Sequence, residues 1–523
     1  MIRVRQVKVD VKCDDISNVL DAACFKAGVK RNDVIDFKIN KKSIDARHKD
    51  CVSFIYEIDF NFRKGCKVKY SNDVVFVDST RYSFSCTGDL KLSSRPIVVG
   101  SGPCGLFCAY ELALNGFKPI VLERGEAMEN RVLSVNKFWE SNKLNINSNV
   151  QFGEGGAGTF SDGKLSTQIK DKNNRIDEVL NVFVSFGAPE EILYDYMPHI
   201  GTDRLRDVVC NMRNKIISLG GEFMYNSCLT DVNIVDGSVS SIVVNDDFVI
   251  PCDVLVLAIG HSARDTFRML HSRGVSMSSK PFAVGLRVMH SQDLINFNQY
   301  GDFYLYLRPA SYKLTYNSSN GRGVYSFCMC PGGYVVNASS EENRLVVNGM
   351  SNYARESGVA NSAIVVTVNS DDFGTDVFDG VKFQENLESL AYKLGDGLIP
   401  IQKFNDFCSG VKSTDFNNFV LRGNYNSALL SDLFSDSIKD SFIEGMNYFG
   451  GKIKNFNDSN VVLAGVESRT SSPIRIYRDD NFISNIDGIY PAGEGAGYAG
   501  GIVSSAVDGI KVFESIVSKY YKV

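Results

Sequence analysis

The stretch PIVVGSGPCGLFCAYELALNGFKPIVLERG, residues 96–125, decides the fold. It opens with a short, fully apolar run, which is typical of a strand buried in a parallel sheet. Gly100, Gly102 and Gly105 then form a G-x-G-x-x-G turn that leads into a helical segment, and a second apolar run ends at Glu123. Strand, glycine turn, helix, strand and acid in this order predict a dinucleotide-binding unit.

Each residue of the turn has a physical role in that unit. Gly100 permits the tight turn, Gly102 allows a pyrophosphate to approach the backbone, and Gly105 lets the helix pack closely on the strand. Ser101 and Pro103 complete the turn, so we expect them at the cofactor too. The N-terminus of the helix offers unpaired N–H groups and a positive dipole to the phosphates.

The residues around Glu123 favour FAD over NAD. Glu123 is spaced to accept hydrogen bonds from the ribose hydroxyls of an adenosine. Arg124 follows it directly, and Arg131 lies a little further on. This arrangement resembles the motif of the glutathione-reductase-type FAD flavoproteins, in which an arginine assists the pyrophosphate region.

Two distant segments resemble other FAD motifs of the same superfamily. GIYPAGEGAGYAGGIVSSAVDGI, residues 488–510, resembles the second FAD motif, where an acid contacts the flavin ribitol and a following helix points at the pyrimidine ring. A helix dipole there stabilises negative charge on the reduced flavin. CDVLVLAIGHSARDTF resembles the strand whose Ala-x-Gly turn crosses beside FAD. The residues that these resemblances assign to the cofactor are Gly260, Gly493, Glu494, Gly501 and Ile502.

A glycine-rich segment, FGEGGAGTFSDGKL, follows the first unit at residues 152–165. Glycine costs about 0.5–1 kcal/mol relative to alanine in regular structure, so the cluster indicates a sharp turn or a close approach. We predict Gly155, Gly156 and Thr159 at the pyrophosphate or the flavin edge. Asp162 and Lys164 are expected near N5 or O4 of the flavin ring, where the charge of the lysine would stabilise the reduced form. The alternative is a structural turn away from the site.

With these residues in view, the chain resembles the family of uncharacterised FAD-dependent dehydrogenases, NAD(P)/FAD-dependent oxidoreductase-like proteins with an N-terminal α/β domain. The likeness extends over residues 43–510, through segments such as SIDARHK, KPFAVGLRV, FCMCPGGYVVNASSEENRLVVNGMSNYAR and VESRTSSPIRI. It implies the flavoprotein fold and FAD, but no particular substrate.

The predicted fold class is α/β, with a Rossmann-like FAD-binding fold of the glutathione-reductase type. Residues 1–92 read as a small α/β domain, because an alternating strand, an amphipathic helix capped by Asp and two more strands follow one another. Residues 93–280 are predicted to be the first part of the FAD domain, 281–465 a strand-rich substrate or cap domain, and 466–523 the C-terminal part of the FAD domain.

A second dinucleotide unit is not evident. Residues 160–280 contain no further G-x-G-x-x-G turn, and residues 233–260 read as a β-meander that feeds the Ala-x-Gly strand. If NAD(P)H is the electron donor, it would have to bind transiently in the substrate cleft.

Three residues are the candidates for catalysis. Besides Lys164, Cys330 could be presented to the cleft by a strand that ends in a Pro-Gly-Gly turn, although Cys328 and Cys330 could equally be packing residues on one side of a strand. Arg469 could clamp a carboxylate or phosphate, and its alternative is an ion-paired loop. His261 could reach the cofactor or a substrate but fits better as a turn residue that caps the next helix.

The composition argues against several classes of protein. The thirteen cysteines are scattered and odd in number, which is not a disulfide framework, and no His/Cys group has zinc spacing. No apolar run is long enough for a membrane span, and the start lacks a secretory signal. We therefore expect a cytoplasmic protein without a metal or a membrane partner, acting on a small molecule.

Charge leaves alternatives open. Residues 1–95 hold 19 Lys and Arg against 13 Asp and Glu, a net of +6, while the whole chain is −5. A basic unit can bind nucleic acid, but here acidic residues alternate with the basic ones, so we do not expect nucleic-acid binding.

The leading hypothesis is a flavoenzyme that transfers hydride between flavin N5 and a small organic substrate. An FAD-dependent tRNA-modifying protein and a non-catalytic flavin redox sensor are the alternatives.

Overall fold

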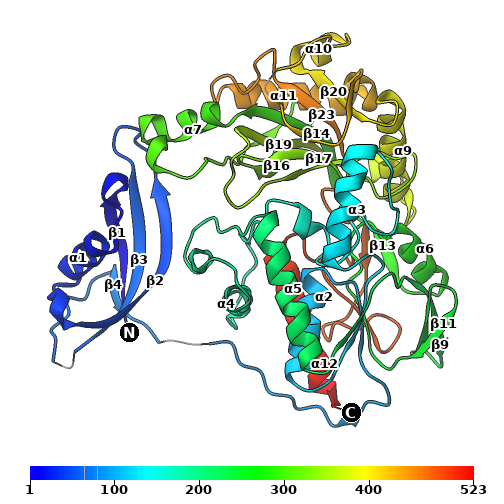
Figure 1. Ribbon diagram of the computed structural model, residues 1–523, viewed down its shortest axis with the longest axis horizontal. Coiled ribbons are helices and arrows are strands. Elements are labelled where there is room, and N and C mark those ends of the chain that lie inside the picture. The colour runs from blue at the N-terminus through cyan, green and yellow to red at the C-terminus, as the bar shows by residue number, and fades with distance from the viewer. Residues whose placement is uncertain (64, 79–80, 418, 523) are drawn as a thin grey trace.

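The computed structural model describes residues 1–63, 65–78, 81–417 and 419–522, and Figure 1 shows their arrangement. Residues 79–80, within the predicted N-terminal domain, lie outside the described residues, as do 64, 418 and 523. The chain has the expected mixed α/β fold with a Rossmann-like unit.

The N-terminal residues form an antiparallel sheet with one helix on it, as the sequence predicts. The strand order is β2-β3-β1-β4. Asp15 caps the helix by accepting a hydrogen bond from the Asn18 N–H, and Gly28 ends it in a left-handed conformation. The elements are β1 (Ile2–Asp10), α1 (Ile16–Ala27), β2 (Val34–Asp45), β3 (Ser53–Phe62) and β4 (Val74–Phe76), with 3₁₀ turns at Val11–Cys13 and Arg31–Asp33.

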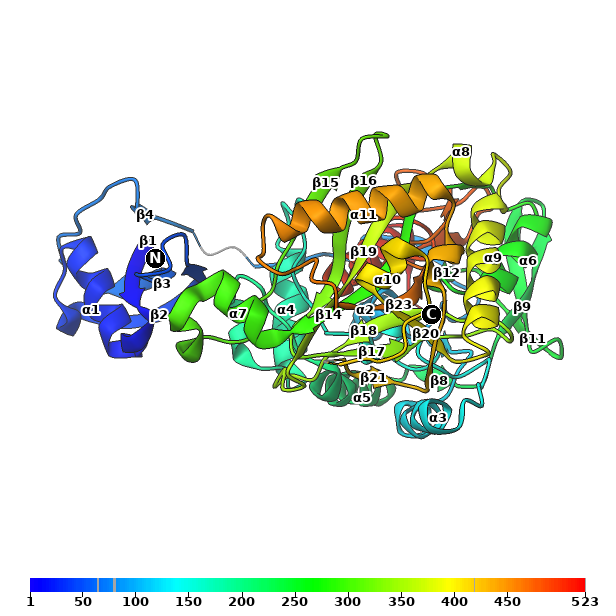
Figure 2. The same ribbon diagram turned by 90° about the horizontal axis from the view of Figure 1, so that it is seen from above.

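This N-terminal sheet is joined to the rest of the chain along its edge strand. The backbone of Lys42 on β2 exchanges hydrogen bonds with Tyr194 and Tyr196, at 2.7 and 2.9 Å. Phe303 and Leu307 pack against its apolar core. Figure 2 shows the sheet at one end of the molecule, beside α7 (Gln292–Tyr300).

The Rossmann-like unit is a parallel sheet of order β25-β12-β6-β7-β8. Its short strands alternate between two cores, because successive side chains point to opposite faces. Val98 belongs to the core shared with α2, α4, α5 and α12, while Ile97 and Val99 belong to the core under the β9–β11 meander. The elements are β6 (Ile97–Val99), α2 (Pro103–Leu114), β7 (Ile120–Leu122), α3 (Met128–Ser141), η3 (Ala157–Phe160), α4 (Arg175–Ser185), η4 (Glu190–Leu193), α5 (Thr202–Ser218), β8 (Glu222–Met224), β9 (Leu229–Val235), β10 (Ser238–Val244), β11 (Phe248–Pro251), β12 (Leu255–Leu257), α6 (Arg264–Ser272), β25 (Ile489–Pro491) and α12 (Ile502–Lys519).

The remaining residues build a seven-stranded sheet of order β15-β16-β19-β14-β23-β20-β22. Helices α9 and α11 share one apolar core with it, and Figure 1 shows this half above the Rossmann-like unit. The elements are β14 (Phe282–Ser291), η5 (Gly301–Tyr306), β15 (Thr315–Asn317), β16 (Gly323–Cys330), β19 (Val359–Val368), α8 (Ser370–Phe373), α9 (Asp379–Leu394), β20 (Ile399–Lys403), α10 (Phe404–Ser409), β22 (Tyr425–Ser427), η6 (Leu430–Leu433), α11 (Asp436–Gly450) and β23 (Val462–Glu467).

Three small sheets complete the fold. They pair β18 (Val347–Met350) and β21 (Leu421–Arg422) with β17 (Tyr334–Asn337), β13 (Met277–Ser279) with β24 (Ile474–Ile476), and β26 (Tyr520–Tyr521) with β5 (Leu90–Lys91). Within the described part of the chain, none of the helices combines the length and apolar composition that a membrane span requires.

Candidate cofactor site

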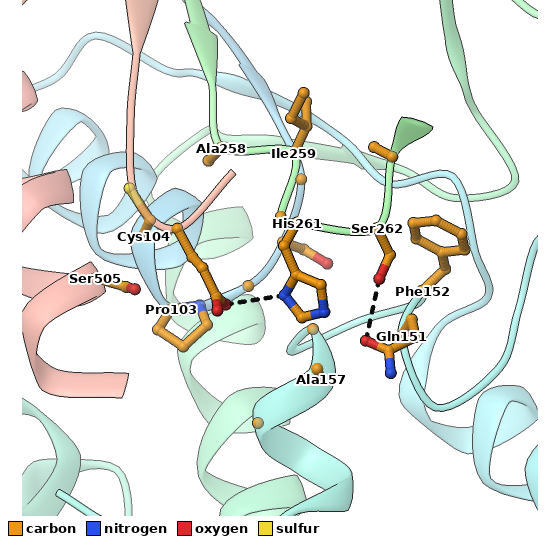
Figure 3. Close-up of a pocket in the computed structure, with 18 of the residues that line it drawn as sticks. Pro103, Cys104, Gln151, Phe152, Ala157, Ala258, Ile259, His261, Ser262 and Ser505 are labelled. Atoms are coloured by element: carbon orange, nitrogen blue, oxygen red, sulfur yellow. Dashed lines mark hydrogen bonds and ion pairs between the residues drawn. The ribbon is translucent and has the colours of Figure 1, made fainter. Parts of the chain in front are cut away.

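A cavity of about 350 Å³ runs from the Rossmann-like unit to the seven-stranded half, and Figure 3 shows part of it. We call two groups of its lining residues the nucleotide wall and the cap wall. The nucleotide wall comprises Gly100, Ser101, Gly102, Pro103, Glu123 and Arg124. The cap wall comprises Asp162 and Lys164 from the glycine-rich segment and Phe327, Cys328, Asn348, Glu467 and Arg469.

Two glycines of the turn at the nucleotide wall, Gly100 and Gly105, leave no room for a larger residue. A Cβ on Gly105 would lie 1.9 Å from the Gly100 oxygen, and a Cβ on Gly100 would lie 2.3 Å from the Ala258 oxygen. Gly100 also has a φ of +100°. Gly102 is the N-cap of α2, and Pro103 is its first residue, so the N-terminus of α2 faces the cavity.

Glu123 ties the nucleotide wall together. One carboxylate oxygen accepts from the N–H and the hydroxyl of Ser101, at 3.0 and 2.6 Å. The other accepts from the N–H groups of Gly125 and Gly153, at 2.9 and 3.0 Å. The side chain therefore fixes the glycine turn to the glycine-rich segment, in addition to lining the cavity.

The glycine-rich segment lies directly against the turn. Gly155 donates its N–H to the Ser101 oxygen at 2.9 Å. A Cβ on Gly156, which has a φ of +65°, would lie 3.1 Å from the Gly102 Cα. The clustered glycines thus permit a backbone-to-backbone approach. Gly156 lines the cavity, whereas Gly155 and Thr159 are not among its lining residues.

Arg131 lies behind this segment and not on the cavity. Its guanidinium is fully buried. It donates to the carbonyl oxygens of Asn149, Val150, Gly153, Glu154 and Gly156 and to the Thr159 hydroxyl. Burial lowers its pKa to about 9. The structure gives Arg131 the part of an internal support that holds the segment in shape.

Arg124, unlike Arg131, lines the cavity. It donates to Asp265 at 2.6 Å and to the Cys228 sulfur at 3.1 Å. Its guanidinium also lies 4.5 Å from the ring centroid of Phe152. These contacts hold the arginine in the wall beside Glu123.

The second predicted FAD motif returns to the same cavity. Glu494, Gly501 and Ile502 line it, and the N-terminus of α12 therefore faces it. Gly493 is not among the lining residues and donates its N–H to Asp508 at 2.7 Å. From the predicted Ala-x-Gly turn, Gly260 lines the cavity as expected.

His261, labelled in Figure 3, and Glu494 both line the cavity and lie next to each other. Its Nδ1 is 3.2 Å from a Glu494 carboxylate oxygen. Its Nε2 is buried, and among the described residues it has no hydrogen-bond partner. The histidine is a lining residue, so a ligand is the group that could satisfy this nitrogen.

Arg469 lines the cap wall but is already paired. It donates to Glu388 at 2.9 and 2.7 Å, to Glu341 at 3.1 Å, and to Ser262 and Ser340. Arg264 holds the other side of the same Glu388 carboxylate, at 2.9 and 2.8 Å. The expectation of a free anion clamp at Arg469 therefore gives way to its alternative, an ion-paired loop.

Of the two alternatives for Cys330, presentation to the cleft and packing within the strand, the structure favours packing. Cys330 is fully buried, whereas Cys328 is half-buried and lines the cavity. The reason is a bulge in β16, where the pairing with β19 shifts register between Phe327 and Cys330. Alternation along a regular strand does not foresee such a shift.

Two cap-wall residues, Asn348 and Glu467, carried no sequence signal. They lie on β18 and β23, which belong to different sheets, and packing between those sheets brings them to the same cavity. Asp162 is buried, and Arg355 holds it at 2.9 Å. Burial would raise the pKa of Asp162, but the charges of Arg355 and Lys164 keep it below the usual range. Within the described residues, no cluster of His, Cys, Asp or Glu could hold a metal ion.

Comparisons with known proteins match three stretches of the chain to family models. Residues 281–470 match the family model described as "FAD-dependent protein, C-terminal domain-like", and residues 98–128 match an NAD(P)-binding Rossmann-like domain. Residues 1–61 match a domain of unknown function. A protein of Clostridium beijerinckii with the name "Uncharacterized protein" is 45% identical over 99% of both chains.

Solved structures are more distantly similar. The L-proline dehydrogenase of P. horikoshii is 12% identical, with 81% of this chain and 93% of that chain covered and a TM-score of 0.33. The glycerol-3-phosphate dehydrogenase of Bacillus halodurans complexed with FAD is also 12% identical, with 82% and 66% covered and a TM-score of 0.35.

The residues present fit FAD. Two helix N-termini, those of α2 and α12, face one cavity and suit an anionic ligand. Gly260 and Gly500 line it, and a Cβ on either would meet nothing within 4 Å, so these backbones border open space. The unpartnered His261 nitrogen adds a buried polar group for a ligand to satisfy.

Proposed function

Because the chain belongs to a family of FAD-dependent oxidoreductases, we propose that it is a dehydrogenase that transfers a hydride between flavin N5 and a small organic substrate. The observation that carries this proposal is the single cavity that joins the nucleotide wall to the cap wall. FAD, when bound, supplies the hydride chemistry, while the protein supplies orientation and electrostatics.

The nucleotide wall would bind the adenosine and the phosphates. The free N–H groups at the start of α2 would hold the phosphates. Glu123 already accepts four hydrogen bonds, which fills the acceptor positions of a carboxylate. A ribose hydroxyl would therefore replace one donor, and the rotatable Ser101 hydroxyl is the one that can turn away.

The cap wall would hold the substrate. Lys164 places a positive charge there, and the N-terminus of α12 adds a positive dipole. Both would favour negative charge on a reduced cofactor. Glu494 and His261 would orient the ligand from the side, with the His261 Nε2 as a hydrogen-bonding group.

The electron donor would share this cavity. In the described residues, the parallel sheet that carries the G-x-G-x-x-G turn is the one that borders the cavity, and no second such unit accompanies it. NAD(P)H, if used, would bind transiently at the cap wall.

A nucleic-acid substrate is not part of the proposal. Many bases of the N-terminal unit are ion-paired within it: Arg3 with Asp59, Lys26 with Asp73, Arg31 with Asp21, Lys42 with Asp14 and Arg47 with Asp45. Charges neutralised in this way contribute little to binding phosphates.

The test is an anaerobic reduction. The purified protein is loaded with FAD, its visible spectrum is recorded, and NADH and then NADPH are added. Bleaching of the flavin band by either nucleotide would support a reductase fed by pyridine nucleotide. A band that only an organic substrate bleaches would support a dehydrogenase reduced by that substrate. A flavin that no donor of either kind reduces would contradict the proposal.

A further inference from the structure

The cap wall carries a positive charge that no neighbour balances. Three of its four charged side chains are already ion-paired: Asp162 with Arg355 at 2.9 Å, Glu467 with Arg287 at 2.8 Å and Arg469 with Glu388 at 2.7 Å. The fourth is Lys164, which is half-buried and whose ammonium group has no ion pair or hydrogen bond with a residue that the structure describes. Since ionised donors make the strongest hydrogen bonds, an anionic ligand is the natural partner of this group.

Asn348 presents a hydrogen-bond donor to the same cavity. Its side-chain oxygen accepts from the Arg287 guanidinium at 2.8 Å and from the Gly349 N–H at 2.7 Å. Both partners can only donate, so the amide oxygen is the atom that faces them. The NH₂ group therefore lies on the other edge of the planar amide, and it donates to none of the described residues. Because Asn348 is half-buried and lines the cavity, a ligand can accept from this group.

Arg287 fixes the asparagine in this orientation. The guanidinium is fully buried. It also donates to the Glu467 carboxylate and to the Cys328 carbonyl oxygen, both at 2.8 Å. A Cβ on Gly349 would lie 2.4 Å from the Arg287 Nη1, so the glycine leaves the room that the guanidinium needs. The amide donor is thus held in place before any ligand arrives, which lowers the entropic cost of binding.

A further contact joins the segments that carry the two donors. The Ser351 hydroxyl, just after β18, donates to the carboxylate of Asp162, two residues before Lys164. The backbone of Lys164 is itself paired with that of His199. Phe327, which is half-buried, adds an apolar ring to the same wall. The wall therefore combines a cation, a fixed amide donor and an apolar surface.

We propose that Lys164 and Asn348 form a subsite for a carboxylate group of the substrate, which is a small organic acid whose carbon chain lies against Phe327. This inference rests on the proposed function. Lys164 supplies charge without a preferred direction, and the Asn348 amide supplies the direction. A single unbalanced charge matches a carboxylate, whereas a phosphate dianion would need a second cation. With Lys164 bound to substrate, the N-terminus of α12 remains as a positive group for the reduced cofactor.

The first test measures binding without turnover. The oxidised, FAD-loaded, full-length protein is titrated by calorimetry with pyruvate and 2-oxobutyrate, and with their uncharged amides. The acids should bind saturably, and the amides about tenfold or more weakly, because they lose the charge-assisted hydrogen bond. No binding of the acids, or equal affinity for acids and amides, would overturn the proposal. So would tighter binding of inorganic phosphate than of pyruvate.

Variants of the two donors assign the effect to this subsite. Lys164→Met removes the charge and should lower the affinity for pyruvate to that for its amide. Lys164→Arg keeps the charge and should keep the preference for the acid. Asn348→Asp replaces the NH₂ group by an oxygen of the same shape and should weaken pyruvate binding about tenfold or more. Lys170→Met is the control, because Lys170 is exposed and is not among the lining residues. An equal loss in Lys164→Met and Lys170→Met would contradict the assignment.

The same variants separate the substrate from the cofactor. If the two donors served FAD instead, Lys164→Met and Asn348→Asp would weaken FAD binding, measured by flavin fluorescence, and leave pyruvate binding unchanged. That result would overturn the proposal. Failure of the wild-type protein to bind FAD would instead sink the proposed function. Calorimetry on the FAD-free protein would then still test the subsite, since Lys164→Met should bind pyruvate more weakly than the wild type, and equal binding would overturn the proposal.

Discussion

The two walls of the cavity are stabilised by different kinds of interaction. The nucleotide wall consists mostly of backbone, shaped by glycines within one short stretch of chain, and its polar anchor Glu123 bonds to neighbouring N–H groups. The cap wall consists of side chains from distant strands, held by buried ion pairs such as Arg287 with Glu467 and Arg469 with Glu388. Substitutions that add volume should therefore destabilise the nucleotide wall most. Substitutions that remove a charge should destabilise the cap wall most.

Removing the charge of Glu388 should have the largest effect. This carboxylate is fully buried between Arg264 and Arg469. Glu388→Gln leaves two buried guanidiniums without their main partner, so the free energy of unfolding should fall by about 3–5 kcal/mol. Chemical denaturation measures the loss.

The matched control for this change lies on the same helix. Glu385, also on α9, pairs with Arg268 and Arg344, whose side chains are 45% and 26% exposed. Glu385→Gln should cost about 1 kcal/mol or less. If the two variants lost equal stability, the distinction between a buried and a surface pair would fail.

The Glu388 effect should also depend on pH. Burial would raise the pKa of this carboxyl, but Arg264 and Arg469 outweigh it and hold the pKa below the usual range. A carboxyl with a depressed folded-state pKa stabilises the fold above its unfolded pKa of about 4.3 and loses that contribution as the pH falls. The stability difference between wild type and Glu388→Gln should shrink steadily as the pH falls below about 5. A constant difference would contradict the assignment.

A single methyl group should break the nucleotide wall. In Gly105→Ala the new Cβ would lie 1.9 Å from the Gly100 oxygen, so α2 must move away from β6. We expect a loss of about 3 kcal/mol in unfolding free energy and a large drop in FAD affinity, measured by flavin fluorescence. Gly500→Ala is the control, because its Cβ would meet nothing within 4 Å. It should leave stability unchanged, and an equal loss in both would refute the steric account.

The smallest effect should come from Ser101. Ser101→Ala removes the 2.6 Å hydrogen bond to Glu123, while three N–H donors to that carboxylate remain. The cost in unfolding free energy should be about 1.5 kcal/mol. Thermal or chemical denaturation would show it. A loss as large as that of Glu388→Gln would mean that the nucleotide wall, too, depends on buried charge.

The same contrast explains what the sequence could reveal. Gly100, Gly102, Gly105 and Glu123 could be predicted because their spacing follows from one strand–turn–helix unit. The α12 motif was readable for the same reason. The fold class and FAD, which these local patterns predict, are confirmed by the comparisons with known proteins.

The cap wall could not be read in this way. Whether Arg469 is free depends on Glu388, which is 81 residues away in the chain. Which of Cys328 and Cys330 faces the cavity depends on a bulge set by pairing with β19. Both are consequences of long-range packing, and no short-range pattern encodes them.

The central claim is that FAD occupies the cavity between the two walls. A titration of the FAD-free protein with FAD, followed by flavin fluorescence, tests it most directly when Gly105→Ala is titrated alongside. We expect saturation at one FAD per chain for the wild type and much weaker binding for the variant. No binding by the folded wild-type protein, or equal binding by both, would contradict it.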